Sequence, residues 1–341
     1  MTSPLRIGFL GAGLIAAYHS KSLKRSGANV VRAGVYDPDT ARAEAFASAS
    51  GHTVCNSVDE VLDGCDAVYI CTWTNSHPEL LARAVARGRH VFCEKPLAFT
   101  ADEAQRMAEA ADAAGVTHQV GLVLRYSPAY VWAKQLVDDP AAGRVMTVVF
   151  RDDQFIPIQG HYASTWRGDV SLVGAGTLLE HSIHDVDMLR YLVGDVRRVS
   201  AHMGYFHGLD GIDDVATASL RFADGATGVL NSVWHDNLAR PSLRRVEIFC
   251  ERRHIVIDGD DWFGPVAWTD SDGTSGSLEG EHLSAAADAL RDGTDNPDGE
   301  FVRAVLEGRP ASPDLHTAVA AHRIVDAMYA SAAADGDTVD V

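Results

Sequence analysis

A glycine-rich turn near the N-terminus constrains this chain more than any other feature of its sequence. The motif Gly11-x-Gly13-x-x-Ala16 follows the apolar run "LRIGFL" directly and leads into a helix-like segment. Gly11 permits a tight turn, and Gly13 lets a pyrophosphate approach backbone N–H groups at the helix terminus. The small Ala16 allows the helix to pack close to the strand. A turn that serves packing alone is the alternative, but this context favours a dinucleotide site in which Leu14 and Ile15 also contact the cofactor.

An acidic residue supports the same interpretation. Asp37 ends the second apolar run, about twenty residues after the turn, where a carboxylate can hold the ribose hydroxyls of an adenosine. A helix cap before Pro38 is the alternative role for this side chain. Because a carboxylate here would repel a 2′-phosphate, the sequence predicts NAD as the cofactor in preference to NADP. Together the turn and the acid predict a Rossmann domain.

The order of apolar runs predicts two domains. Runs that alternate with helical segments lie at residues 5–10, 30–36, 67–72, 90–94 and 117–121. This alternation predicts an α/β domain, placed at residues 1–124, with a doubly wound parallel sheet covered on both faces. The later strand-like runs have few helices between them and predict an α+β domain over residues 125–341, with a large, mostly antiparallel sheet. Within it we expect a surface loop at 270–299 and a C-terminal helix at about 300–333.

Composition argues against several classes of partner and compartment. A formal net charge of −18 is opposite to the basic surface that a duplex nucleic acid requires. Apolar runs stay shorter than the ~18 residues of a membrane helix, and the N-terminus lacks the pattern of a signal peptide. The five cysteines form no CxxC pair, which is typical of buried thiols in a reducing compartment. We therefore expect a soluble cytoplasmic protein without nucleic-acid or membrane partners.

The stretch "HVFCEKPLAF" (90–99) places charged residues directly after a buried strand. Glu94, Lys95 and Pro96 follow its apolar residues. Ligands of open parallel sheets collect at the carboxyl ends of the strands, so the Lys95 ammonium is placed to polarise a hydroxyl or carbonyl oxygen. A surface turn in which Lys95 merely pairs with Glu94 is the alternative.

Further motifs are specific jointly rather than singly. Thr72, Asn75 and His77 correspond to a Thr-x-Asn-x-x-His pattern, with one extra residue between Thr72 and Asn75 and one fewer between Asn75 and His77. The segments "GLVLRYSP", "GAGTLLEHSIHDVDMLRYLVG" and "EFVRAVLEGRPASPD" supply an Arg-x-x-Pro element, a glycine-rich turn before a helix, and a helix entry. With the N-terminal fingerprint and the Glu-Lys-Pro sequence, the chain resembles the Gfo/Idh/MocA oxidoreductase family over nearly its whole length.

The resemblance implies a Rossmann domain followed by an α+β domain with an open sheet, in a homodimer or homotetramer formed through that sheet. It implies NAD(P)-dependent oxidation or reduction of a sugar, inositol or related polyol, and makes Lys95–Pro96 a candidate cis peptide. His77 with Pro78 equally suits the first turn of the next helix. The cofactor site predicted in this part of the chain comprises Thr72, Asn75, His77, Glu94 and Lys95.

Hydride transfer from a secondary alcohol requires a base for the hydroxyl proton and a group that stabilises the developing alkoxide. Besides Lys95 we assign Glu180 and His184 as catalytic residues, since residues four apart share one face of a helix. His184 titrates near neutrality and can accept or return the proton. Family enzymes commonly carry an aspartate in place of Glu180, so this residue can orient His184, bind a hydroxyl or pair with Lys95. The cluster with His181 and Asp187 is an alternative metal site, but its spacing does not favour one and we expect none.

Candidate substrate-binding residues lie in two further places. Arg125 and Tyr126, at the predicted domain junction, either contact substrate or pack the domains together. In the loop "GHYASTWRGD" (160–169), Trp166 offers a flat apolar face to a sugar ring and Arg167 offers hydrogen-bond donors. Weaker candidates in the same loop are His161 and Tyr162. The predicted substrate-binding set is Arg125, Tyr126, Trp166, Arg167 and His181.

Three functions fit these features. The first is an NAD-dependent dehydrogenase that acts on a secondary alcohol of a cyclic polyol or sugar. The second is a glycosidase of the same architecture that oxidises a sugar carbon transiently and returns the hydride, without net NADH. The third is a non-catalytic NAD sensor, although such a protein could lose Lys95 or His184 without penalty and this chain keeps both. The retained residues favour the dehydrogenase.

Overall fold

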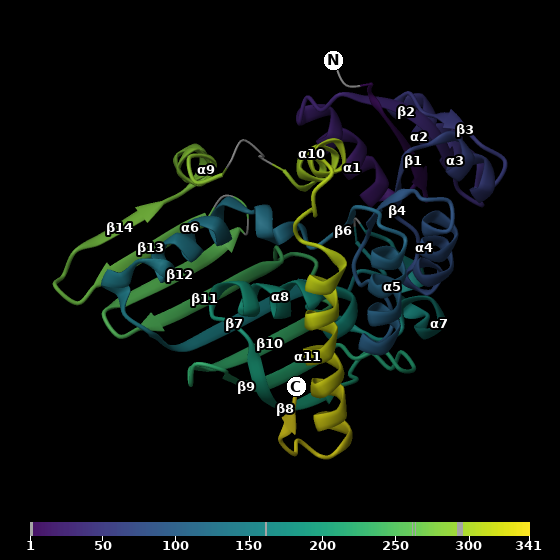
Figure 1. The fold of residues 1–341 in the computed structure, drawn as a ribbon. Coiled ribbons are helices and arrows are strands. Elements are labelled where there is room, and N and C mark those ends of the chain that lie inside the picture. Colours follow the sequence, from purple (N-terminus) through teal and green to yellow (C-terminus); the bar gives the residue numbers. More distant parts are fainter. Residues whose placement is uncertain (1–2, 161, 261, 263, 292–295) are drawn as a thin grey trace. The chain divides into compact units, whose positions relative to one another are not determined.

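The computed structural model describes residues 3–160, 162–260, 262, 264–291 and 296–341 (Figure 1). By their contacts these residues form two compact units. The first unit comprises residues Met1–Val123 and Thr294–Val319, and the second comprises Leu124–Gly293 and Ala320–Val341. The first boundary falls next to the predicted one, whereas the return of a late segment to the first unit differs from the predicted division.

The first unit is built on a six-stranded sheet. Its strands are β1 (Leu5–Leu10), β2 (Val30–Tyr36), β3 (Thr53–Val54), β4 (Ala67–Ile70), β5 (His90–Cys93) and β6 (His118–Val120). They lie in the order β3-β2-β1-β4-β5-β6, and every pairing is parallel. The predicted doubly wound Rossmann sheet is therefore confirmed.

Strand residues of the first unit alternate between two cores. The helices are α1 (Leu14–Arg25), α2 (Thr40–Ser50), α3 (Val58–Gly64), α4 (His77–Val85) and α5 (Ala101–Ala113). In one core, the Tyr69 ring stacks 4.8 Å from Phe9 and 4.6 Å from Phe92 between ring centroids. The sequence neighbours Leu10 and Ile70 belong to the other core. Because both faces are covered, these strands are apolar throughout rather than in alternation.

The predicted C-terminal helix at 300–333 is two helices, α10 (Pro297–Glu307) and α11 (Leu315–Ala333). Gly308 closes α10 in the left-handed conformation, with φ of +66°. A cis Ser312–Pro313 bond lies in the connection between the two helices. A glycine cap followed by proline is the usual end of a helix, and both signals are present in the sequence.

Helix α10 belongs to the first unit because of its apolar face. Phe301 is fully buried, with its ring centroid 5.6 Å from that of Tyr69 and 5.7 Å from that of Phe92. These rings are the stacked pair at the centre of the sheet. A segment near the end of the sequence thus completes a core that begins with β1.

The second unit contains a nine-stranded sheet. Its strands are β7 (Val145–Phe155), β8 (Val196–Gly204), β9 (Val215–Phe222), β10 (Thr227–His235), β11 (Leu243–Cys250), β12 (Arg253–Asp260), β13 (Gly264–Asp270), β14 (Ser275–Leu278) and β15 (Val339–Asp340). They lie in the order β14-β13-β12-β11-β7-β10-β9-β8-β15. The pairing of β10 with β7 is parallel and the others are antiparallel, which confirms the predicted mostly antiparallel sheet.

Helices cover one face of this sheet. Helices α6 (Pro128–Asp138) and α8 (Ile183–Leu192), with the later part of α11, pack on it (Figure 1). In β7, Val148 and Phe150 point into this core and are fully buried, whereas Val149 is 39% exposed. Because side chains alternate along a strand, Val149 lies on the opposite, open face.

The segment 270–299 contains regular structure, contrary to the predicted surface loop. Strand β14 and helix α9 (Gly280–Asp288) lie within it. A Cβ at Gly276 would approach the Trp268 ring to 2.3 Å, so the glycine makes room for an aromatic side chain of the paired strand. Small residues that suit this packing remove the alternation by which a strand is recognised.

All five cysteines are free and buried, as predicted. Burial raises the pKa of the Cys71 and Cys93 thiols well above the ordinary value, so these groups stay protonated and unreactive. Among the described residues, no helix combines the length and the apolar character needed to cross a membrane.

Candidate active site

Gly11 and Gly13 shape the turn between β1 and α1. Gly11 has φ of +89°, and a Cβ there would lie 2.4 Å from the carbonyl oxygen of Cys71, so only glycine fits. Gly13 is the N-cap residue of α1, and apart from its neighbours in the chain no atom of the described residues lies within 4 Å of the position that its Cβ would occupy. Leu14 is 70% exposed, while Ile15 packs partly against the core. The helix terminus therefore borders open space, which fits a bound pyrophosphate.

Asp37 is held beside this turn by main-chain hydrogen bonds. Its Oδ2 accepts from the amide N–H of Ala12 and its Oδ1 from that of Asp39, both at 2.9 Å. The N-cap of α2 is Asp39, which accepts from the Arg42 amide, so Asp37 is not the helix cap. A half-exposed carboxylate at the end of β2, tied to the glycine turn, fits the ribose of a dinucleotide.

The loop after β4 is joined to the turn after β5 by a buried histidine. His77 is 1% exposed, with Nδ1 3.0 Å from the carbonyl oxygen of Pro96 and Nε2 3.2 Å from that of Thr72. Burial lowers the pKa of His77, and a neutral ring donates to one of these two carbonyls. The Thr72 hydroxyl accepts from Ser76 at 2.7 Å, while Asn75 is exposed. Direct contact of Thr72, Asn75 and His77 with the cofactor stays a prediction.

The Glu94-Lys95-Pro96 turn rests on a buried carboxylate. Glu94 is 5% exposed, and its Oε2 accepts the backbone N–H of Lys95 at 3.1 Å. A Cβ at Gly121 would lie 2.4 Å from the same side chain, so the next strand leaves no spare room beside it. The Lys95–Pro96 bond is cis, as predicted. The turn is therefore not the exposed surface turn that was considered as an alternative, and Lys95 itself is half-buried.

In the second unit, Asp213 anchors the glycine-rich turn that precedes α8. Its Oδ1 accepts from the Gly176 amide at 2.8 Å and its Oδ2 from the Leu178 amide at 3.0 Å. The hydroxyl of Tyr329 donates to the same carboxylate at 2.8 Å. A Cβ at Gly176 would lie 1.9 Å from the Asp213 carbonyl oxygen, so this residue must be glycine.

Glu180 and His184 lie on two different helical pieces. Glu180 is in the π-helical turn η5 (Thr177–His181), whereas His184 is in the first turn of α8. The spacing rule of one regular α-helix, from which a shared face was predicted, therefore does not apply across this segment. Both residues are buried, Glu180 at 3% and His184 at 9% exposure.

Three of the predicted residues meet around Glu180. Its Oε1 accepts from Nε of Arg167 at 2.8 Å. The Arg167 guanidinium lies 4.6 Å from the ring centroid of Trp166, which precedes it in the short helical turn η4 (Thr165–Gly168). Trp166 and Arg167 are both half-buried. His161 of the same loop lies outside the described residues.

His181 leads to a buried charge network that was not predicted. Its Nε2 lies 2.7 Å from Oδ2 of Asp152. Arg244 reaches the same oxygen at 3.0 Å and donates from Nε to Oδ1 of Asp185 at 2.8 Å. Asp152 and Asp185 are 2% and 0% exposed. Burial, and then Asp152, raise the pKa of Asp185 to about 7 against the opposing effect of Arg244.

The sequence does carry a signal for this network. Val148, Phe150 and Asp152 are alternate residues of β7, so period 2 places Asp152 on the covered face. Arg244 alternates in the same way with Val246 of β11 and is directly paired with Asp152. Only knowledge of the strand register shows that the two charges are opposite one another.

Arg125 and Tyr126 are engaged elsewhere in the second unit. Arg125 donates from Nε and from Nη2 to the two oxygens of Asp187, at 2.8 and 2.7 Å. Its guanidinium also lies 5.3 Å from the ring centroid of Tyr191. Asp187 is fully buried, and the Tyr126 carbonyl accepts from Arg291. The Arg125–Asp187 pair anchors α8, and contact of Arg125 or Tyr126 with substrate stays a prediction.

Known proteins match the chain along most of its length. A model described as an oxidoreductase family with an NAD-binding Rossmann fold matches residues 5–122, and the GFO/IDH/MocA C-terminal domain matches residues 130–256. The scyllo-inositol 2-dehydrogenase (NAD(+)) of Bacillus subtilis is 33% identical over 239 residues, 67% of each chain. The chain belongs to the Gfo/Idh/MocA family of oxidoreductases.

Other members of the family show the same architecture. The myo-inositol 2-dehydrogenase of Thermotoga maritima is 29% identical over 319 residues, 90% of each chain. The structure of levoglucosan dehydrogenase in complex with NADH matches with a TM-score of 0.87 at 25% identity, over 99% of each chain. These similarities confirm the predicted family and identify this member as a dehydrogenase with an NAD-binding domain.

One group of side chains in this family member has the spacing of metal ligands, among the residues that the structure describes. Asp112 bridges two histidines, with Oδ1 3.0 Å from Nε2 of His118 and Oδ2 2.8 Å from Nε2 of His316. The Nδ1 of His118 accepts from the Leu315 amide, which fixes the ring proton on Nε2, where a metal would have to bind. This hydrogen bonding favours ion pairs over a metal, and the absence of a metal from the active site stays a prediction.

The raised pKa of Asp185 leads to a prediction for the stability of the dehydrogenase. Between about pH 4 and 7 the folded protein holds a proton on Asp185 that the unfolded chain has already lost. The free energy of unfolding therefore falls as the pH rises through that range. Asp185→Asn removes the titrating group and is expected to reduce this fall. Urea unfolding of both proteins across the range measures it. Asp195→Asn makes the same substitution at an exposed acid and should keep the wild-type dependence of the unfolding free energy on pH. An unchanged dependence in Asp185→Asn would contradict the raised pKa of Asp185.

Proposed function

We propose that this chain is an NAD-dependent dehydrogenase that transfers a hydride between a secondary alcohol carbon of a sugar or cyclic polyol and the nicotinamide. The observation that carries the proposal is the Glu94-Lys95-Pro96 turn, held on a buried carboxylate at the carboxyl end of β5. Relatives named as inositol dehydrogenases support the substrate class. The name of levoglucosan dehydrogenase, a structural match, points in the same direction.

NAD, when bound, supplies the two-electron acceptor for the hydride. The chain then has to stabilise the oxygen and remove its proton. The Lys95 ammonium polarises the reacting oxygen and offsets the negative charge that develops on it. The His184 imidazole accepts the hydroxyl proton, or returns it in the reverse direction. Glu180, held by Arg167, is assigned to orienting His184 or binding a substrate hydroxyl.

An uncharged substrate suits the polar groups of the second unit. Three arginines near the assigned residues already pair with buried carboxylates, in the pairs Arg125–Asp187, Arg167–Glu180 and Arg244–Asp152. A sugar acid or sugar phosphate would need a cation whose charge is not already compensated in this way. Histidine, tryptophan and carboxylate side chains instead suit hydroxyl groups and the apolar face of a ring. We therefore propose neutral inositols and hexoses as the substrate class.

The choice of NAD over NADP rests on Asp37. Asp37→Asn keeps the size of the side chain and one acceptor oxygen for the two main-chain amides, but it removes the charge that opposes a 2′-phosphate. We expect the ratio of kcat/KM for NAD to that for NADP to fall by about tenfold or more, equivalent to about 1.4 kcal/mol. Initial rates with each cofactor measure it. Asp39→Asn, at the neighbouring cap of α2, is the matched control and should leave the ratio unchanged.

Turnover tests the proposed chemistry directly. Absorbance at 340 nm with NAD and a panel of inositols, hexoses and sugar acids is expected to show NADH formation with a neutral member. Lys95→Met and His184→Asn should each lower kcat by about 10²–10⁴-fold, because each removes a group that acts on the hydroxyl proton or charge. Binding of NADH, followed by its fluorescence, should stay within a few-fold of wild type.

Two other outcomes distinguish the alternatives. Release of a leaving group from an aryl glycoside without net NADH would identify the redox-neutral glycosidase. NADH binding without turnover of any panel member or glycoside, and without effect of either substitution, would favour a sensor. If Lys95→Met has the same kcat as the wild-type enzyme, the proposed role of this lysine is wrong.

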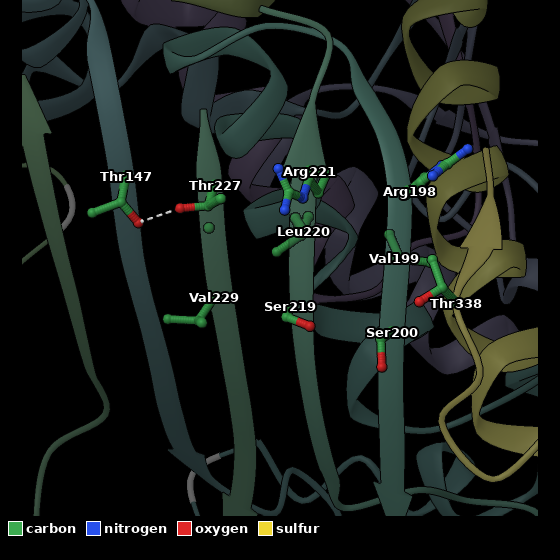
Figure 2. A pocket seen from close by; sticks show the side chains of 11 residues that line it. Thr147, Arg198, Val199, Ser200, Ser219, Leu220, Arg221, Thr227, Val229 and Thr338 are labelled. Carbon is green, nitrogen blue, oxygen red and sulfur yellow. Dashed lines mark hydrogen bonds between the residues drawn. The ribbon is translucent and has the colours of Figure 1, made fainter. Parts of the chain in front are cut away.

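We also propose that a second copy of the chain covers the open face of the nine-stranded sheet. This face exposes the apolar side chains of Met146, Val149 and Val229, each at least 39% accessible. A hollow of about 410 Å³ lies on strands β7 to β10 of this face. Figure 2 shows the side chains that line it, among them Thr147 and Thr227, which are hydrogen bonded at 3.1 Å. Most side chains of this surface are short, and two arginines, Arg198 and Arg221, also line the hollow. Such a surface suits a self-complementary interface, in a homodimer or within a homotetramer.

Val229→Arg tests this interface. A further guanidinium beside those of Arg198 and Arg221 would add positive charge to the buried hollow, so the assembly is expected to dissociate to monomers. Sedimentation velocity at several concentrations measures the mass in solution. Val31→Arg, at a similarly exposed valine of the first unit, should leave the assembly intact. A wild-type monomer, or an unchanged mass in Val229→Arg, would contradict the proposed interface.

A reducing compartment is the remaining part of the proposal. The five free, buried thiols support a cytoplasmic location, because oxidising compartments favour paired cysteines. The acidic composition and the absence of a membrane-spanning helix among the described residues support partners limited to small molecules and further copies of the chain.

A further inference from the structure

His19 lies in a buried chain of charged side chains in the first unit. Its Nε2 is 2.7 Å from Oε1 of Glu94, and its Nδ1 is 2.8 Å from Oδ1 of Asp298. The second oxygen of Glu94 accepts the backbone N–H of Lys95 at 3.1 Å. His19 and Asp298 are 0% exposed and Glu94 is 5% exposed. Helix α1, the turn after β5 and helix α10 thus meet at one imidazole ring.

The hydrogen bonds of His19 require its charged form. Each ring nitrogen faces a carboxylate oxygen, which accepts but does not donate, so both nitrogens must carry a proton. Burial by itself lowers the pKa of His19, but the two carboxylates outweigh it and raise the pKa to about 10. The ring therefore stays an imidazolium over the range in which an ordinary histidine, with a pKa of about 6.5, is neutral.

The phenol and thiol groups packed around this chain are neutral. Burial and then Asp298 raise the pKa of Tyr18, and the same two causes raise that of Tyr69 well above its ordinary value. Burial and then Glu94 raise the pKa of the Cys71 thiol. The His19 ring also packs 4.7 Å from the Phe92 centroid. In this apolar setting His19 is the cation in contact with both carboxylates, and electrostatic attraction is little screened by water.

We propose that His19 is a positioning residue for Lys95: clamped as an imidazolium between Asp298 and Glu94, it holds the Glu94 carboxylate in the orientation that accepts the Lys95 N–H. The inference rests on the proposed function, since it assumes that Lys95 acts on the substrate. His19 touches neither the substrate nor Lys95 in this account. It acts through Glu94, and Asp298 acts through His19.

The energetics suit this role. Hydrogen bonds in which one partner is ionised are roughly twice as strong as neutral ones. Two of them, from the His19 ring and from the Lys95 N–H, fix the Glu94 side chain, which has three rotatable bonds. Without the imidazolium, Glu94 would be a buried carboxylate that has lost its compensating charge, and its orientation would no longer be defined. A displacement of about 1 Å in a reacting group can cost about 10²-fold in rate. His19 is therefore placed to influence turnover more than cofactor affinity.

The charge state of His19 is tested first, on wild-type protein. Nitrogen-15 NMR of histidine-labelled protein, with His19 assigned by its loss in His19→Gln, is expected to show both ring nitrogens protonated at a pH well above about 6.5. Titration of His19 near that ordinary value would overturn the proposal. This measurement needs no substrate, so it stands whether or not the proposed dehydrogenase activity is found.

Hydrogen exchange then tests the positioning of Lys95 without turnover. The amide of Lys95 is expected to exchange faster in His19→Gln and in Asp298→Asn, because Glu94 no longer holds its N–H. His52→Gln is the matched control, since His52 is another buried histidine of the same unit that packs on Phe9 rather than on Glu94. Unchanged exchange in both variants would overturn the proposal. Asp298→Asn, which keeps the side-chain shape, serves if His19→Gln does not fold.

Kinetics separate positioning from packing once a substrate is known. His19→Gln and Asp298→Asn should lower kcat about 10- to 100-fold while the Kd for NADH stays within about threefold. In a Glu94→Gln background, His19→Gln should cost little more, because both act through the same carboxylate. Losses that multiply independently, or a loss in NADH affinity alone, would overturn the proposal. Absence of turnover in wild type would instead refute the proposed function.

Discussion

Parallel pairing of β1, β4 and β5 determines where the first unit carries its chemistry. The register aligns Leu10 with Ile70 and Ile70 with Cys93, so the residues that follow these three strands leave the sheet in one row. The row consists of Gly11, Cys71 and Glu94. Its tightness explains why Gly11 admits no Cβ, and its direction explains why the glycine turn and the Lys95 turn lie at the same edge. Asp37, at the end of β2, joins this edge through the Ala12 amide.

Both units place one cation between two buried carboxylates. In the first unit His19 lies between Glu94 and Asp298, and in the second Arg244 lies between Asp152 and Asp185. The two cations differ in chemistry, since arginine keeps its proton at any physiological pH whereas histidine keeps its own here because of its neighbours. In the arginine cluster the carboxyl group of Asp185 is the member that titrates near neutrality, while in the histidine cluster the ring is fixed in its charged form.

The features that could be predicted from the sequence depend on residues that are neighbours along the chain. Gly11, Gly13 and Asp37 follow from the conformational needs of one strand–turn–helix unit, and Lys95 follows from the end of one strand. The partners of Glu94 could not be found in this way, because Asp298 lies on a helix near the other end of the chain.

The second unit shows the same limit. Helical spacing predicted a shared face for Glu180 and His184, but Glu180 lies in a π-helical turn that ends before α8 begins, and no residue of that segment signals it. The pairing of Asp152 with Arg244 depends on the register of two strands separated by about ninety residues of sequence. Sequence reasoning thus proposed reactive side chains, whose roles stay predictions, and missed the groups that hold them.

The return of α10 to the first unit has a consequence for how the protein is made. Residues 1–123 contain all six strands of the nucleotide-binding sheet. They lack Phe301, which packs on Tyr69 and Phe92, and Asp298, whose carboxylate compensates the positive charge of His19. On the ribosome, which adds residues from the N-terminus onward, this unit remains incomplete until α10, which follows most of the second unit in the sequence, has been synthesised and has emerged. The cofactor-binding unit, although it begins first, is therefore completed only after most of the second unit has been synthesised.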